Sequence, residues 1–167
     1  MIAKQVQYLR SNVGFSLVEL AVTLAVLSIL TAIVAPNFFQ LLVRKEMDSA
    51  QRNIAVAINK AKTIARTQST TVTVSRLADG SGVSISSGVL AQAQIFPIKD
   101  ASVVFRDSGG VTMNPAAFTF DALGKVTPLT GGEIEIMSSR DSSGKVKLIE
   151  ITNGFGHIKL DERDATS

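Results

Sequence analysis

Residues 14–20 read GFSLVEL and begin an almost uninterrupted apolar run that extends to Val43. Within this run the only charged side chain is that of Glu19. A helix needs about 20 apolar residues to cross the hydrocarbon layer of a bilayer, and residues 15–36 supply about that length. We therefore predict a transmembrane helix over residues 15–43.

The flanks of the run indicate its orientation and argue against an ordinary secretory signal. Lys4 and Arg10 precede the run without any acidic residue, which places the N-terminus in the cytoplasm, although Arg44 and Lys45 follow the run. A secretory signal has an apolar core of roughly 7 to 15 residues that ends at a small-residue cleavage site. Here the run is longer and its small residue, Gly14, comes first, so we expect the apolar part to be retained.

Glu19 is the unusual residue of this segment. A carboxylate within the hydrocarbon costs roughly 2.5 to 3.5 kcal/mol, so such a residue usually has a partner or a function. Either Glu19 lies close enough to the cytoplasmic interface to stay hydrated, or it pairs with a cation of another subunit when the helix leaves the bilayer.

A glycine, the sequence FSLVE at residues 15–19 and a proline at position 36 resemble the N-terminal signal of type IV pilins and type II secretion pseudopilins. The resemblance implies that a prepilin peptidase removes residues 1–14 as a leader, cuts after Gly14 and methylates the new N-terminal residue, Phe15. It also implies that Glu19 meets the N-terminal amine of a neighbouring pilin or pseudopilin subunit during assembly. The chain would be stored in the inner membrane, with its head in the periplasm, before the helix enters a filament core.

Residues 44–67 read as an amphipathic continuation of the helix. Pro36 removes a backbone donor and is expected to kink the helix or melt it locally; the alternative is two separate helices broken at this proline. Beyond it, apolar residues recur at helical spacing and predict a face packed on a globular domain: Met47, Ala50, Ile54, Ala57, Ile58, Ala61, Ile64 and Ala65. Lys45, Arg52, Asn59 and Arg66 fall on the opposite side.

Residues 68–167 are predicted to form a β-rich head. Polar and apolar residues alternate at 71–75 and 83–86, with the turn sequence DGSG between them, which predicts a hairpin. Further strands are expected at 94–98, 101–106, 118–120, 133–137, 146–151 and 157–160. The glycines between these runs favour short connections and an antiparallel arrangement. The expected fold is α+β and pilin-like, with one long N-terminal helix packed on an antiparallel β-rich head.

Two short motifs in the head resemble the GspH/FimT branch of minor pilins and pseudopilins. They are FDALGK at 120–125 and GHIK at 156–159. Some FimT-like proteins bind DNA through a Gly-Arg-x-Arg motif, but here His157 and Lys159 replace both arginines and remove the forks that grip phosphate in a bidentate way. The acidic residues after position 160 are expected to form a solvated tail that repels a polyanion.

Composition argues against catalysis and metal binding. The chain has no cysteine and one histidine, so Cys–His catalysis is excluded and zinc lacks its usual ligands. We expect no cofactor, and the DGSG and DSGG stretches at 79–82 and 107–110 are expected to be plain turns. The prediction is a minor pseudopilin or pilin that assembles into a type II secretion pseudopilus or a type IV pilus, at or near its tip. The alternatives are a minor pilin that binds nucleic acid and a membrane-tethered periplasmic protein that does not assemble.

Overall fold

The computed structural model describes residues 15–128 and 132–164. The chain divides into two compact units, Met1–Phe38 and Phe39–Ser167, and the helix α1 (Leu17–Thr67) contributes residues to both. The described part of the second unit is called the head below. The leader expected at residues 1–14, Gly14 included, lies outside the described residues.

The helix α1 is continuous through Pro36. The alternative of two separate helices broken at this residue is therefore wrong, and so is the expectation of local melting. A proline removes only one backbone donor, and the turns on either side of it keep their hydrogen bonds. A long helix can therefore tolerate a proline. A kink at Pro36 stays a prediction.

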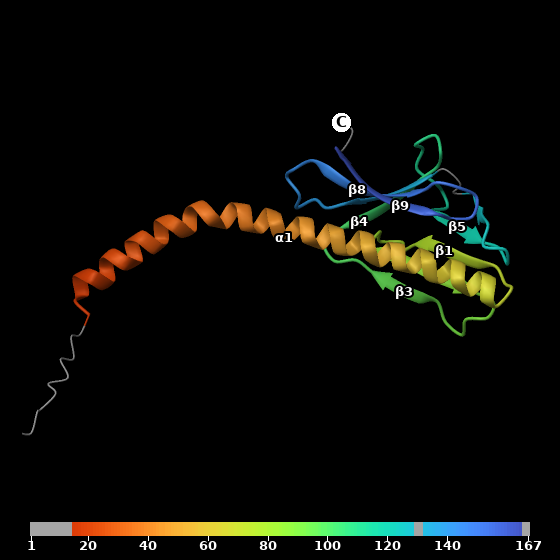
Figure 1. Cartoon of the computed structure of the whole chain (residues 1–167), viewed down its shortest axis with the longest axis horizontal. Coiled ribbons are helices and arrows are strands. Elements are labelled where there is room, and N and C mark those ends of the chain that lie inside the picture. Colours follow the sequence, from red (N-terminus) through yellow and green to blue (C-terminus); the bar gives the residue numbers. More distant parts are fainter. Residues whose placement is uncertain (1–14, 129–131, 165–167) are drawn as a thin grey trace, which may run out of the picture. The chain divides into compact units, whose positions relative to one another are not determined.

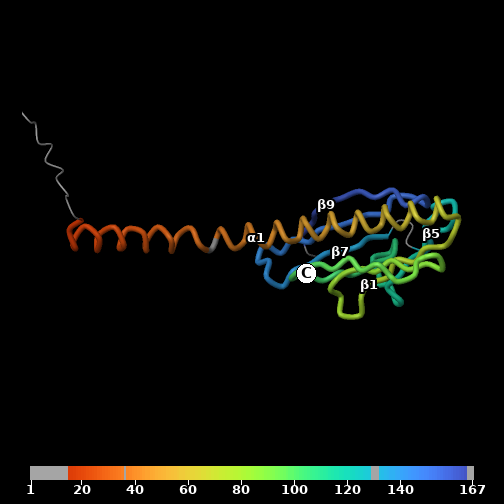
Figure 2. The backbone as a smooth tube through the Cα atoms, turned by 90° about the horizontal axis from the view of Figure 1, so that it is seen from below, coloured from red at the N-terminus to blue at the C-terminus, as the bar shows by residue number. Residues whose placement is uncertain are grey.

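Nine strands follow α1 among the described residues and form two antiparallel sheets. The first sheet has the order β3-β2-β1-β5-β6 and the second has the order β4-β7-β8-β9. The strands are β1 (Val72–Arg76), β2 (Gly82–Ser87), β3 (Gln94–Pro97), β4 (Ser102–Arg106), β5 (Ala117–Phe120), β6 (Val126–Thr127), β7 (Glu133–Met137), β8 (Lys145–Ile151) and β9 (Ile158–Asp164). Within the head, α1 runs with β9 on one side and the first sheet on the other (Figures 1 and 2).

One hydrophobic core joins α1 to both sheets. The predicted apolar stripe of α1 is confirmed: seven of its eight residues are buried, and Ile64 packs against them. In β1 and β2 the valines and isoleucine point into this core while the serines and threonine lie on the other face. Each fully buried aliphatic side chain contributes about 1.5–3 kcal/mol relative to an exposed one, so burial of this stripe holds α1 to the sheets.

The second sheet also carries a buried ion cluster, which no sequence pattern indicated. Glu135 on β7 is only 4% exposed. One of its carboxylate oxygens lies 2.6 Å from Nε of Arg106, and the other accepts a hydrogen bond from Arg163. Arg163 also pairs with Glu133 at 2.9 Å. Two guanidinium groups thus offset the desolvation of a carboxylate that would be costly to bury alone.

The predicted hairpin is confirmed by the antiparallel pairing of β1 with β2, and all the other predicted strands are present. Two details of the prediction were wrong. The two-residue strand β6 was missed because it is too short to show a period of two. The residues after Leu160 were expected to be a solvated tail, but β9 continues to Asp164 in backbone pairing with β8, and Glu162 there forms ion pairs with two lysines of β8.

Candidate assembly site and head surface

The first turn of α1 brings Phe15, Ser16 and Glu19 together at one helix end. Phe15 precedes the helix and is 80% exposed. The hydroxyl oxygen of Ser16 accepts a hydrogen bond from the backbone N–H of Val18 at 3.3 Å, as an N-cap residue does. Glu19 lies three residues after this cap, in the first turn, where the helix dipole favours a negative charge. The sequence SLVE thus starts the helix and places a carboxylate next to the chain's expected new N-terminus.

The helix surface that follows Glu19 is apolar on all sides and exposed. Large side chains from Leu20 to Val34 are at least half exposed. The hydroxyl groups within this stretch donate to carbonyls of the preceding turn: Thr23 to Leu20 and Thr31 to Leu27, at 2.8 and 2.7 Å. These bonds leave no donor of either threonine unsatisfied in an apolar medium. The helix is long and apolar enough to cross a membrane, and the same surface suits packing among other apolar helices.

His157 and Lys159, the two residues weighed for DNA contact, lie at the start of the edge strand β9. The His157 side chain is exposed. The Lys159 ammonium lies 2.8 Å from the Asp161 carboxylate and 3.8 Å from that of Glu150. The hydrogen bond to Asp161 is the main cause that raises the pKa of Lys159. A phosphate would have to compete with two carboxylates for this lysine, so the geometry does not favour polyanion binding at these residues.

Glu162, which was expected to lie in a solvated tail, lies in the strand β9, and its charge is paired. Hydrogen bonds from Lys147 and Lys145 hold the pKa of the Glu162 carboxyl at about 2, below its ordinary 4.5. Lys147 also reaches Asp48 of α1 at 2.8 Å. A carboxyl whose pKa is lowered in the folded state contributes stability above its unfolded pKa, and this contribution is lost as the pH falls through the folded value.

We expect a Glu162→Gln variant to unfold at a lower temperature than the wild type at neutral pH, and we expect this difference to disappear as the pH falls from about 4.5 to about 2. Thermal unfolding of the detergent-solubilised full chain, followed by circular dichroism across this pH range, measures the difference. Glu150→Gln is the control, because the 3.8 Å pair of Glu150 with Lys159 is looser and exposed. A difference that stays constant with pH would rule out the proposed ion pair.

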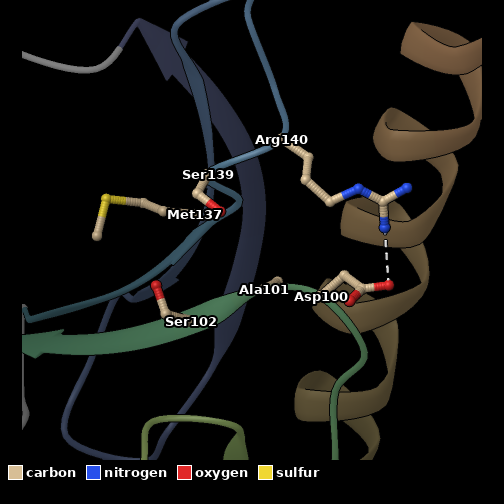
Figure 3. Close-up of a pocket in the computed structure, with 6 residues that line it drawn as sticks. All are labelled: Asp100, Ala101, Ser102, Met137, Ser139 and Arg140. Atoms are coloured by element: carbon tan, nitrogen blue, oxygen red, sulfur yellow. Dashed lines mark hydrogen bonds and ion pairs between the residues drawn. The ribbon is translucent and has the colours of Figure 1, made fainter.

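A shallow hollow of about 280 Å³ opens beside the start of β4 (Figure 3). Asp100, Ser102, Met137, Ser139 and Arg140 are among its lining residues. Arg140 extends across the hollow to Asp100, with 2.8 Å between Nη1 and Oδ2. The same guanidinium lies 3.5 Å from Glu46 of α1. These charges satisfy one another, so the hollow presents no free charged group to a ligand.

Both acidic stretches, 79–82 and 107–110, form turns closed by their own aspartates. The Asp79 carboxylate accepts hydrogen bonds from the backbone N–H and hydroxyl of Ser81, and the Asp107 carboxylate accepts from the backbone N–H groups of Gly109 and Val111. In the described part of the chain, no group of three or more acidic or histidine side chains is arranged to hold a metal ion.

Comparison with known families gives a match at the N-terminus. Residues 10–35 match the family described as the prokaryotic N-terminal methylation motif. This range includes Gly14, Phe15 and Glu19, the residues selected from the sequence. No curated protein matches the chain.

Comparison with solved structures identifies the fold. The chain is similar to the type IV minor pilin FimU of Pseudomonas aeruginosa strain PAO1, with 21% identity over 72% of this chain and 92% of that chain, and a TM-score of 0.54. A second crystal form of FimU gives 22% identity over 68% and 91% of the two chains, with a TM-score of 0.52. The minor pseudopilin EpsH of the Vibrio cholerae Type 2 Secretion System gives 10% identity over 69% and 95%, with a TM-score of 0.49.

The chain combines this motif with a known fold. It carries the N-terminal methylation motif, and it has the fold of the minor pilin FimU. The predicted fold class, one long helix packed on an antiparallel β-rich head, is confirmed.

Proposed function

We propose that the chain is a minor pilin or pseudopilin subunit that assembles into a type IV pilus or a type II secretion pseudopilus, at or near the tip. One observation carries this proposal. The exposed apolar segment of α1 has a single charge, and that charge is a carboxylate in the first helical turn, inside a methylation motif. A helix that served only as a membrane tether would not need this costly carboxylate.

The proposed mechanism is assembly rather than catalysis. A prepilin peptidase removes residues 1–14 while the chain is held in the inner membrane, with its N-terminus in the cytoplasm and its head in the periplasm. Cleavage frees the amine of Phe15. Glu19 of one subunit then pairs with this amine of a neighbour, which makes both charges tolerable in the apolar filament core. The exposed apolar surface of α1 packs against the helices of other subunits.

The test is whether the full chain leaves the membrane. Its native host, expressing a tagged chain, is sheared, and the filament fraction is separated from the membranes and probed for the tag. We expect the chain in the filament fraction, in amounts well below those of the major subunit. A chain that stays entirely in the membrane under conditions that produce filaments would support the tether alternative and refute assembly.

A Gly14→Val substitution is expected to leave the leader attached. A branched side chain at the cleavage position should hinder the close approach of the peptide bond to the peptidase. A loss of at least about tenfold in cleaved chain corresponds to ~1.4 kcal/mol or more on the barrier. Intact mass spectrometry measures both the leader and the methyl group on Phe15. Val13→Ala is the matched control and should be processed normally. Normal processing of Gly14→Val would refute the cleavage assignment.

A further inference from the structure

The outward face of α1 in the head is basic, and only its first cation, Lys45, has acidic neighbours in the sequence, Glu46 and Asp48. No aspartate or glutamate occurs from Ser49 to Ala78. Lys45, Arg52 and Arg66 lie along one line of the helix, spaced by seven or fourteen residues, and Lys60 and Lys62 lie on either side of this line. These five cations are called the basic face of α1. Seven residues correspond to about 10.5 Å along a helix, so the charges on this line are about 10 to 20 Å apart.

No cation of the basic face is paired with a carboxylate, a property that it shares in the described head with Arg44, Arg76, Lys99 and Lys125. Six other cations each lie within 4.0 Å of a carboxylate: Arg106, Arg140, Lys145, Lys147, Lys159 and Arg163. Among the described residues, no cation of the basic face forms an ion pair; Lys60 instead lies 5.8 Å from the centre of the Phe96 ring. Lys62 and Arg66 are four residues apart, and such like-charge pairs destabilise a helix by about 0.2–0.5 kcal/mol. A bound partner with carboxylates would remove this repulsion.

Exposed apolar side chains lie within and beside the basic face. Val56, within the face, is 58% exposed, and Leu123 is 75% exposed. Leu123 belongs to the turn after β5, and this turn packs on the end of α1: a Cβ added to Gly124 would lie 2.8 Å from Cδ of Arg66. The Asp121 carboxylate of the same turn accepts hydrogen bonds from the backbone of Leu123 and Lys125 and forms no ion pair with Arg66.

The carboxylates of the head are already engaged within the chain, which argues against a second copy as the occupant of this face. Eight lie in ion pairs: Glu46, Asp48, Asp100, Glu133, Glu135, Glu150, Asp161 and Glu162. Four accept hydrogen bonds from their own turns: Asp79, Asp107, Asp121 and Asp141. In the described head only Asp164 does neither. A second copy would therefore offer five carboxylates that are in no ion pair, and four of these already accept hydrogen bonds within their own turns.

We propose that the basic face of α1, together with Val56 and Leu123, docks a different pilin-like subunit that presents exposed carboxylates around an apolar recess. This inference rests on the proposed function, because it names the chemistry of a neighbour in the filament. A protein partner fits better than a nucleic acid, since apolar anchors within a polar rim are typical of protein interfaces, whereas single-stranded nucleic-acid sites combine cations with aromatic rings that stack on bases and nonspecific duplex sites need only cations that contact phosphates.

A cysteine-protection experiment tests the contact directly, because the chain has no cysteine of its own. A Val56→Cys variant of the full chain is made in its host, and maleimide labelling is compared between the membrane-stored and the filament fractions. Ile95→Cys on β3 is the matched control, since Ile95 is 60% exposed against 58% for Val56. We expect Val56→Cys to be labelled in the membrane and protected in filaments, and Ile95→Cys to be labelled in both.

Charge reversal tests the chemistry of the partner. We expect the double variant Arg52→Glu with Arg66→Glu to be processed and stored in the membrane normally, but to enter filaments at least about tenfold less than the wild type, which corresponds to ~1.4 kcal/mol or more. Lys99→Glu, at an exposed lysine of the head without an ion pair, is the control and should enter normally.

The outcomes separate this inference from the proposed function. A wild-type chain that is absent from filaments would refute assembly itself. A chain that enters filaments with Val56→Cys still reactive, or with the double reversal tolerated, would overturn the docking face and leave assembly intact. Protection of Val56→Cys by a DNA duplex added to the detergent-solubilised full chain at moderate salt would replace the protein partner with a nucleic acid and equally overturn the proposal.

Discussion

Replacing Glu19 by glutamine should keep the chain in the membrane and remove it from filaments. Glutamine retains the length of the side chain and can still serve the first turn of α1, but it cannot neutralise an amine. Removing one partner of a buried ion pair typically costs 3–5 kcal/mol, because the other charge is left unpaired. At about 1.4 kcal/mol per tenfold, we expect incorporation to fall by a factor of roughly 100 or more.

Two further substitutions separate charge pairing from helix capping. Glu19→Asp keeps the charge and should restore part of the incorporation, since a shorter side chain reaches the amine less well. Ser16→Ala removes the hydroxyl that accepts from Val18 and should cost about 1 kcal/mol of helix stability without a comparable loss of incorporation. Quantitative immunoblots of sheared and membrane fractions, normalised to total chain, measure all three variants.

The membrane fraction supplies an independent check on Glu19. A buried carboxylate opposes insertion by roughly 2.5–3.5 kcal/mol, so the glutamine variant should insert at least as well as the wild type and accumulate there. Normal entry of Glu19→Gln into filaments would show that the charge is dispensable. Loss of the variant from both fractions would point to degradation instead and would contradict the expected membrane pool.

The sequence predicted the elements whose residues repeat with a clear period. The apolar stripe from Met47 to Ala65 repeats with the helical period, and its residues form the α1 side of the core. The alternation in 71–75 and 83–86 likewise predicted the hairpin of β1 and β2. In each case local spacing alone decides which side chains share a face, so no knowledge of distant residues was needed.

Contacts between distant residues could not be predicted in this way. Asp161 and Glu162 follow one another near the C-terminus and look like part of a solvated acidic tail, yet both lie in a strand paired with β8, and lysines of β8 neutralise Glu162. The cluster around Glu135 joins three strands. Strand pairing across tens of residues decides these partners, and charge composition along the chain does not reveal it.

The residues singled out for function likewise divide into those that the local sequence indicates and those that only the three-dimensional structure indicates. Gly14, Phe15 and Glu19 could be proposed from the sequence because they lie in a short linear motif. The basic face of α1 was visible only in part, as polar residues opposite the apolar stripe. Its meaning depends on which cations elsewhere in the head have carboxylate partners, and this information comes from the three-dimensional arrangement.

Substituting Gly156 by alanine should destabilise the head more than any other single change considered above. Gly156 has a φ of 62°, a backbone conformation that costs a non-glycine residue about 1–3 kcal/mol. A Cβ at this position would overlap Cε1 of Phe120 and lie 3.0 Å from its Cζ. Phe120 is fully buried in the core, so its ring cannot move without disturbing other packed side chains, which adds about 1–3 kcal/mol. We expect a total loss of about 2–6 kcal/mol.

Gly154→Ala is the matched control for Gly156→Ala, two residues earlier in the same turn. No atom lies within 4 Å of a Cβ added to Gly154, and its φ is not positive, so alanine there should change stability by less than about 1 kcal/mol. Thermal unfolding of the two detergent-solubilised full chains compares them. Equal stability of both variants would contradict the close approach of Gly156 to Phe120. The expected difference would explain the glycine of the GHIK motif by core packing alone, without any contact between this turn and a polyanion.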